Sequence, residues 1–440
     1  MSPFKWKNMV TIGLVFTAAL QAGAVHAELS ALEKSIVQHV DTQLPLALDE
    51  LKTAVNINSG TMNFAGVEQV GRLYQQQFDA LGFHTEWIPG KAFNRAGHLQ
   101  ASYGTRGPKI LMIGHLDTVF TKDDQFQAYR DLGNGKVAGP GITDMKGGNT
   151  IVVAALRALK AEGVLDDMQV RVLFTGDEES SGKPLSLSKK AIVEGAKWAD
   201  IALGFEDGDS NIKTAVIARR GSMGWRLEVS GRPAHSSQVF TDAVGYGAAY
   251  EVARILNEFR QKIDGLGAAT VNPGLLVAGN KSLELDVNNA EAMAGKSNIV
   301  AQTAIVKGDL RTLSPEELAR AQATMNEIVQ SNLKHTSAKL SFAEGYPPMP
   351  PTEANRKLLA QYSQVSEELN YGPVTPVNPR KAGAADISFA ADYVDMALDG
   401  LGLMGSGGHT RDEVADMDSF KKNIHKAAIL MHRLAKQHTP

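Results

Sequence analysis

Acidic and histidine residues follow apolar runs at five places along the chain. These places are MIGHLDTVF with His115 and Asp117, GPGITDMKGG with Asp144, FTGDEESSG with Glu178 and Glu179, LGFEDGD with Glu206, and GSGGHTRDE with His409. Imidazole nitrogens and carboxylate oxygens are ligands for zinc and similar divalent ions. A lone histidine, an acidic pair or a glycine turn is usually structural, so only the five segments together predict a metal site centred on Asp144.

Short apolar runs precede three of these segments and predict the strands that position them. Residues 109–114, 170–175 and 201–205 read as buried strands that end at His115, at Asp177-Glu178-Glu179 and at Glu206. Ligands of open α/β sheets bind at the carboxyl edge of such strands. Residues 150–162 repeat apolar positions at helical spacing, which places Asp144 at the turn into a helix. An α/β domain with its chemistry at the strand ends is therefore expected.

The remaining chain divides into flanking elements and an insertion. We predict a helix over 29–55 with a break or kink at Pro45, a helix over 67–81, and strands at 83–88 and 99–103. From about residue 215 the pattern is β-α-β-β-α-β, which is typical of helices packed on an antiparallel sheet. The elements expected there are strands at 223–230, 271–278, 299–310 and 339–343, with helices at 242–263 and 315–333. A helix at 352–370, a strand at 396–403 and a helix at 417–437 then return to the first domain.

Composition excludes several classes of protein. The chain has 440 residues, 43% hydrophobic and 21% charged, which suffices for two domains with buried cores. A net charge of -3 with dispersed Lys and Arg predicts neither nucleic-acid nor membrane partners. Cysteine is absent, so the chain has neither disulfides nor a lipid-modified cysteine.

The first 27 residues have the pattern of a signal peptide. Lys5 and Lys7 precede an apolar stretch over 9–22, and Val25-His26-Ala27 is a small-residue cleavage site. The apolar stretch is shorter than the about 20 residues of a membrane span. We expect cleavage after Ala27 and a periplasmic or secreted protein.

The HxD, GxxDMKGG, DEE and GGH elements together resemble the M20 family of metallopeptidases, and in particular its glutamate carboxypeptidase-like branch. The resemblance covers essentially the whole chain after residue 27. It implies a zinc-exopeptidase-like α/β catalytic domain, with a mostly parallel mixed sheet between helices, interrupted by an inserted α+β dimerisation or lid domain. The corresponding ranges are 28–217 and 345–440 for the catalytic domain and 218–344 for the lid.

The resemblance also implies roles for single residues. Asp144 would bridge two zinc ions per chain, with His115 and Glu206 completing one site and Glu179 and His409 the other. Asp117 would orient the His115 imidazole, and a cis peptide bond would follow Asp144. Glu178 would be the general base that activates a metal-bridging water and passes its proton to the leaving amine.

Further residues match positions that bind substrate in the family. His235 in GRPAHSS would stabilise the oxyanion in the partner subunit of a homodimer. Asn298 and Arg311 would contact the substrate's terminal carboxylate, and Gly383 would lie against the substrate. The chain departs from the branch at two places. It has Glu344-Gly345-Tyr346-Pro347 where the branch carries a basic residue before the proline, and it has GAAD where the branch has three glycines. A preference for C-terminal glutamate therefore stays open.

Three hypotheses about the activity are compatible with the sequence. The first is a zinc exopeptidase that releases the C-terminal amino acid of a small peptide or an N-acyl amino acid. The second is an N-acyl-amino-acid deacylase with the same metal chemistry and a different pocket. The third is an inactive zinc-binding dimeric scaffold, which the full set of ligands together with Glu178 disfavours. A phosphoesterase is disfavoured because no phosphate clamp accompanies the predicted ligands.

Overall fold

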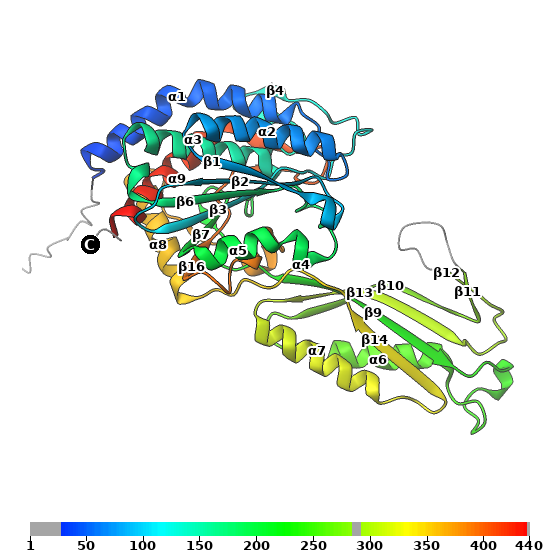
Figure 1. Cartoon of the computed structure of the whole chain (residues 1–440). Helices are drawn as coiled ribbons and strands as arrows, with labels where there is room; N and C mark the ends of the chain where they lie inside the picture. Colours follow the sequence, from blue (N-terminus) through cyan, green and yellow to red (C-terminus); the bar gives the residue numbers. More distant parts are fainter. Residues whose placement is uncertain (1–27, 284–291, 438–440) are drawn as a thin grey trace, which may run out of the picture.

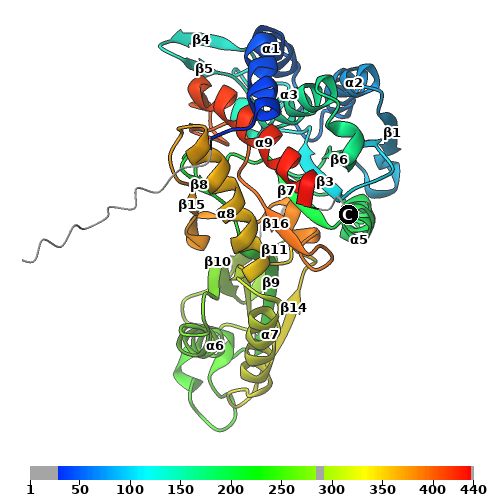
Figure 2. The same ribbon diagram turned by 90° about the vertical axis from the view of Figure 1, so that its left-hand side faces the viewer.

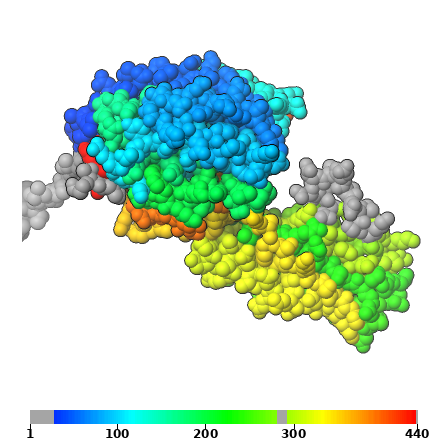
Figure 3. All heavy atoms as spheres, in the orientation of Figure 1, coloured from blue at the N-terminus to red at the C-terminus, as the bar shows by residue number. Residues whose placement is uncertain are grey.

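The computed structural model describes residues 28–283 and 292–437, so the expected signal peptide lies outside the described residues. Two lobes are visible in ribbon and space-filling views, a large one and a smaller one that projects from it (Figures 1, 2 and 3). Among the helices of the described ranges, none has the length and apolar character needed to cross a membrane.

A six-stranded mixed sheet forms the centre of the large lobe. Its order is β1-β2-β6-β3-β7-β16, and the pairs β6/β3, β3/β7 and β7/β16 are parallel. The strands are β1 (His84–Pro89), β2 (Gly97–Tyr103), β3 (Lys109–His115), β6 (Gln169–Thr175), β7 (Ile201–Gly204) and β16 (Met396–Leu398). Only β1/β2 and β2/β6 are antiparallel within this sheet. The expected mostly parallel mixed sheet is confirmed.

Helices cover both faces of this sheet (Figures 1 and 2). One side carries α2 (Phe64–Ala80) and α3 (Gly147–Ala161), with α1 (Ala31–Val55) and α9 (Met417–Gln437) packed against α3. The other side carries α4 (Leu185–Ser188) and α5 (Lys190–Trp198), while α8 (Glu353–Glu368) packs on β16 and α9. The prediction of a break at Pro45 was wrong, because α1 continues through it as one helix.

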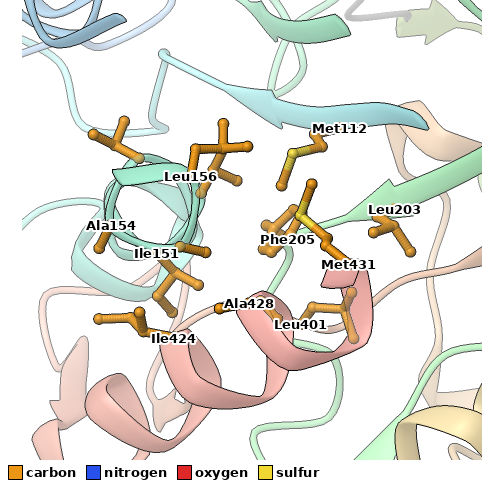
Figure 4. Close-up of a cluster of buried hydrophobic side chains, with 14 of the residues drawn as sticks. Met112, Ile151, Ala154, Leu156, Leu203, Phe205, Leu401, Ile424, Ala428 and Met431 are labelled. Atoms are coloured by element: carbon orange, nitrogen blue, oxygen red, sulfur yellow. The ribbon is translucent and has the colours of Figure 1, made fainter. Parts of the chain in front are cut away.

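The core between the sheet and these helices joins segments from both ends of the chain. Met112 of β3 and Leu203 of β7 face Ile151 and Leu156 of α3 and Met431 of α9, all fully buried (Figure 4). Burying a side chain of this size contributes roughly 1.5–3 kcal/mol to folding. The C-terminal helix is thus part of the same core as the first strands.

The smaller lobe is a four-stranded antiparallel sheet with two helices on one face (Figure 1). The strand order is β10-β13-β9-β14, with β9 (Gly221–Gly231), β10 (Thr270–Gly279), β13 (Thr303–Thr312) and β14 (Thr336–Phe342). The helices α6 (Gly247–Ile263) and α7 (Pro315–Gln330) bury Phe259 and Met325 in a separate core around Trp225. Between β10 and β13 the structure adds the short pair β11 (Lys281–Leu283) and β12 (Ala292–Ala294).

Several boundaries differ from the predictions because the backbone turns there. Helix α6 begins at Gly247 and not at residue 242, since Gly245 and Gly247 have φ of 75° and 74°. Strand β16 ends at Leu398 and not at residue 403, since Gly400 has φ 75° shortly after it. The positive φ values of these glycines interrupt regular helices and strands. Strand β13 begins at Thr303 and not at residue 299.

Two further small sheets of short strands were not predicted. One has the order β17-β18-β5-β4, formed by β4 (Arg130–Gly133), β5 (Lys136–Ala138), β17 (Gly405–Ser406) and β18 (Val414–Asp416). The other pairs β8 (Thr214–Ala215) with β15 (Thr375–Pro376). The first matters for the site, because β17 and β18 flank the loop that carries His409.

The two lobes are joined by adjacent chain segments. Arg219 exchanges both backbone hydrogen bonds with Met349 at 2.9 Å, and Ser222 does the same with Tyr346 at 3.0 and 2.9 Å. We call residues 219–222 and 346–349 the hinge. It places Tyr346 next to the residues that follow β6, as described below.

Candidate metal centre

Two groups of metal-ligand side chains share Asp144 at the carboxyl edge of the central sheet. One contains His115, Asp144 and Glu206, the other Asp144, Glu179 and His409, and within each group the ligand atoms lie within 4.8 Å of one another. The Oδ1 atom of Asp144 lies 2.9 Å from His115 Nε2, and its Oδ2 atom lies 2.8 Å from His409 Nε2. One carboxylate therefore presents each of its oxygens to a different imidazole, as a bridging ligand does.

Strand ends and turns deliver these five side chains. His115 is the last residue of β3, Glu179 follows β6, and Glu206 follows β7. Asp144 lies in the turn before α3, where its φ of -119° and ψ of 90° leave the helical conformation. The peptide bond Asp144-Met145 is cis, as the resemblance implied. His409, with φ 62°, comes from the loop between β17 and β18.

The Asp117 carboxylate bonds mainly to the segments that follow the strands, and less to the His115 imidazole. Its carboxylate accepts hydrogen bonds from Thr61 Oγ1 at 2.6 Å and from the backbone N–H groups of Glu178 and Glu179 at 3.0 and 3.2 Å. The nearest partner of His115 Nδ1 is the backbone carbonyl of Asp117 at 2.9 Å, while the Asp117 carboxylate lies 3.6 Å away. Asp117 thus fixes the imidazole through its backbone and the acidic pair through its side chain.

Glu178 and Glu179 have different surroundings. Glu179 Oε2 lies 3.1 Å from His409 Nε2, and its Oε1 atom is buried without a hydrogen-bond partner. Burial raises the pKa of Glu178 well above its usual value, and nearby carboxylates of Asp386 and Glu179 add to the effect. Such an environment is suited to a carboxylate that takes up a proton.

Glu413 is a site residue that was not predicted from the sequence. Its buried carboxylate accepts hydrogen bonds from Gly141 N and Thr143 N, both at 2.8 Å, from Thr143 Oγ1 at 3.0 Å and from Asp144 N at 3.2 Å. It therefore shapes the turn that carries the shared Asp144. Its position four residues after His409 was the available sequence signal.

A second missed group lies behind Glu178. The hinge residue Tyr346 has its hydroxyl 3.1 Å from the Glu178 carbonyl, 2.9 Å from Ser181 Oγ and 3.1 Å from Asp386 Oδ1. The buried ammonium of Lys189 pairs with Asp386 Oδ1 at 3.0 Å and with Asp177 Oδ1 at 2.9 Å. These contacts anchor the backbone of Glu178 to the hinge and to the start of α5.

The charges of the two groups suit a cation. Although burial opposes protonation of His115, the carboxylates of Glu206, Asp117 and Asp144 hold its pKa well above the usual value. Hydrogen bonds to Asp144 and Glu179 raise the pKa of His409 to about 11. Burial, followed by the charge of Asp144, raises the pKa of Glu206 well above its usual value. Protons are thus held between closely spaced carboxylates and imidazoles, where divalent cations would balance the same negative charge.

Comparison with known proteins agrees with this geometry. The model of the peptidase family M20/M25/M40 matches residues 111–437. The chain belongs to the M20 family. It is an M20-type dinuclear metallohydrolase, and the two groups that share Asp144 are the candidate ligands for two metal ions.

Individual M20 relatives span most of the chain. Carboxypeptidase G2 of Pseudomonas sp. (strain RS-16) is 27% identical over 428 residues, which are 96% of this chain and 97% of that protein. Succinyl-diaminopimelate desuccinylase of Gluconobacter oxydans (strain 621H) is 26% identical over 357 residues, which are 78% of this chain and 86% of that protein. The crystal structure of aminopeptidase PepT from Bacillus cereus ATCC 10987 has a TM-score of 0.67 at 17% identity, covering 88% of this chain and 98% of that one. The last comparison supports the M20 fold.

The candidate substrate-binding residues in the smaller lobe fall into two sets. Arg311 lies at the hinge end of β13, where it pairs with Ser222 of β9 and its Nε atom contacts Asp309 Oδ2 at 2.7 Å. His235 and Asn298 lie together beyond the other end of β9, where Ser236 N donates to the Asn298 carbonyl at 2.8 Å. With about 3.3 Å per residue, the strand separates the two ends by roughly 30 Å. The structure therefore does not bring Asn298 and Arg311 together within one chain.

Gly383 lies on the hinge side of the metal centre. Its carbonyl accepts a hydrogen bond from Arg219 Nη1 at 3.0 Å, and Arg219 Nε pairs with Asp399 Oδ2 at 2.7 Å. Asp399 Oδ1 in turn accepts from the backbone N–H of Glu206 at 3.3 Å. The His115–Glu206 half of the M20 site is thus connected to the hinge.

Proposed function

We propose that this M20 enzyme is a zinc-dependent exopeptidase or amidohydrolase that cleaves the amide bond to the C-terminal amino acid of a small peptide or an N-acyl amino acid. The observation that carries the proposal is the shared Asp144, whose two oxygens each face one imidazole at 2.9 and 2.8 Å. Glu178 belongs to neither group of ligands, and the charge of Asp144 is close enough to help raise its pKa.

The ligand set fits two zinc ions. His115 and Glu206 would hold one, Glu179 and His409 the other, with Asp144 between them, and the unpartnered buried Oε1 of Glu179 offers a further ligand atom. When bound, zinc lowers the pKa of a coordinated water and polarises the scissile carbonyl. Asp117 and Glu413 hold the surrounding backbone, so the ligand side chains are positioned before substrate arrives.

Glu178 is the proposed general base. It accepts a proton from the attacking water at its carboxylate and donates it to the nitrogen of the leaving amine. Burial favours its protonated form, which makes the carboxylate a better proton acceptor than an exposed glutamate. Its backbone is held on both sides, by Asp117 at the N–H and by Tyr346 at the carbonyl.

A homodimer is the proposed active assembly. Arg311 at the hinge end of the lid would contact the substrate carboxylate in its own chain, since a guanidinium pairs with a carboxylate bidentately. His235 and Asn298, at the other end of β9, would serve the metal centre of a second copy. Cross-linking tests the assembly, and activity measurements on mixed variants test the exchange of residues. A variant lacking His235 should regain turnover when it is mixed with a variant lacking Glu178.

The second candidate function is deacylation of N-acyl amino acids, including N-succinyl compounds. The similarity to succinyl-diaminopimelate desuccinylase favours this candidate, because it extends over 78% of the chain. The metal centre would be the same, and only the pocket for the acyl group would differ.

Release of free amino acid by the purified protein distinguishes these functions. N-blocked dipeptides ending in Glu, Ala, Phe or Lys are compared with matched N-acetyl and N-succinyl amino acids, with added zinc and with a chelator. We expect chelator-sensitive release, and we expect Glu178→Gln to retain two metals per chain while kcat falls by about 10³-fold or more, in the range of lost acid–base catalysis. Chelator-resistant turnover, or full turnover in Glu178→Gln, would refute the proposal.

A further inference from the structure

A pocket of about 440 Å³ opens beside the metal centre, next to Glu179. It lies between the loop after α1 and the loop after β3, and we call it the Met62 pocket. Its lining includes Thr61, Met62, Val119, Lys122, Glu179 and Ser180. Glu179 lines this pocket and also faces His409, so the pocket is continuous with the His409–Glu179 half of the site.

The walls of the pocket carry exposed apolar side chains. Met62 is 63% exposed and Val119 is 38% exposed, whereas most large apolar side chains of this lobe are buried in its core. Lys122 provides the one cationic side chain among the lining residues named. Apolar groups left in contact with water at an active site gain stability when a substrate covers them.

The pocket is built before any ligand binds. Its two loops are joined by backbone hydrogen bonds from Thr61 N to the Thr118 carbonyl at 3.1 Å and from Thr118 N to the Ser59 carbonyl at 2.9 Å. The Asn58 amide also donates to the Phe120 carbonyl at 3.1 Å. At Gly60 a Cβ atom would lie 2.2 Å from the Phe120 carbonyl oxygen, so the loops pack too closely for any other residue. A fixed pocket costs little ordering entropy on binding.

The positions of Arg311 and of the Met62 pocket would orient the substrate. Arg311, the proposed carboxylate-binding residue, lies at the hinge end of β13, whereas Arg219 is buried and already paired with Asp399. Glu179 of the metal centre lines the Met62 pocket, whose lining among the described residues includes the apolar Met62 and Val119 and no arginine. A substrate with its free carboxylate at Arg311 and its scissile bond at the metal centre would extend its acyl side into this pocket.

We propose that the Met62 pocket binds the acyl side of the substrate and selects a bulky apolar acyl group over acetyl. The inference rests on the proposed amidohydrolase function and adds the class of acyl group to it. Its volume accommodates an aliphatic chain of several carbons or one aromatic ring.

The test compares acyl groups on one leaving amino acid, namely N-acetyl, N-hexanoyl, N-benzoyl and N-succinyl derivatives. We expect kcat/KM for the hexanoyl and benzoyl substrates to exceed that for the acetyl substrate by about tenfold or more, since one buried methylene alone gives such factors in closed pockets. Met62→Ala should lower the hexanoyl-to-acetyl ratio of kcat/KM by about fivefold, mainly through KM. The matched control is Leu46→Ala, which truncates a side chain that is 44% exposed on α1, and it should leave the ratio unchanged.

Three results would overturn the inference. Equal kcat/KM for acetyl and hexanoyl substrates would remove it while leaving the amidohydrolase function in place. A preference for succinyl over hexanoyl would show that Lys122 and not the apolar wall governs the pocket. Absence of turnover with every substrate would refute the proposed function itself, and the pocket assignment with it.

Discussion

The Glu413 carboxylate offers a direct test of how the shared Asp144 is positioned. Its two oxygens accept four hydrogen bonds from Gly141, Thr143 and Asp144. Glu413→Gln keeps the shape of the side chain but places an NH₂ group where Oε2 accepts from Gly141 N. Losing one hydrogen bond to a charged group costs about 1.5–3 kcal/mol. Burial raises the pKa of Glu413 to about 7, so a neutral side chain offsets part of that cost.

We expect the net effect to appear in metal affinity more than in folding. Loss of groups that hold metal ligands typically weakens binding by about 10–100-fold. The assay is zinc competition with a chromophoric chelator, with metal content per chain measured after gel filtration. Asp412→Asn is the matched control, because it removes the same charge from the exposed neighbouring residue. Unchanged zinc affinity in Glu413→Gln would refute the positioning role.

Three further predictions concern the hinge, a buried lysine and the core. Tyr346→Phe should lower kcat by about tenfold with unchanged metal content, because Glu178 loses a hydrogen bond worth about 1–2 kcal/mol to its backbone; wild-type kcat in steady-state assays would contradict this. Burial lowers the pKa of Lys426 to about 7, so the folded state binds fewer protons than the unfolded state between that pH and about 10.5. The charged Lys426 therefore lowers the free energy of unfolding by its full amount below pH 7. This loss disappears as pH rises to about 10.5, by at most about 1.4 kcal/mol per pH unit. Lys426→Met should therefore be more stable than wild type at pH 7 and similar at pH 10 in urea unfolding, whereas a constant difference would show that burial is not the cause. Leu156→Ala in the core of Figure 4 should lower the free energy of unfolding by about 2–5 kcal/mol in the same measurement. A decrease as small as that for the exposed Leu46→Ala would indicate that the core repacks to fill the space.

The sequence predicted those parts of the site that depend on local pattern. Apolar runs that end at His115, Glu179 and Glu206 became β3, β6 and the end of β7, because buried parallel strands need continuous apolar residues. The helix after Asp144 followed from its spacing of apolar residues in the same way.

Features set by contacts between distant segments were missed. Glu413 acts on residues about 270 positions earlier in the chain, and Tyr346 acts on Glu178 across the hinge. The strand β4 was missed because all four of its residues are exposed and show no alternation. The separation of Asn298 from Arg311 followed only from the register of β9 and β13.

The contact between Glu413 and the Asp144 turn also bears on the order in which the protein matures. During synthesis a chain folds from its N-terminus as residues emerge, and His115, Asp144, Glu179 and Glu206 are all made before residue 207. His409 and Glu413 are made about 200 residues later, and α9, which completes the core of Figure 4, comes later still. A nascent chain that ends before His409 therefore carries most of the ligands but not the residues that complete and shape the site, so binding of two metal ions requires that synthesis has passed Glu413.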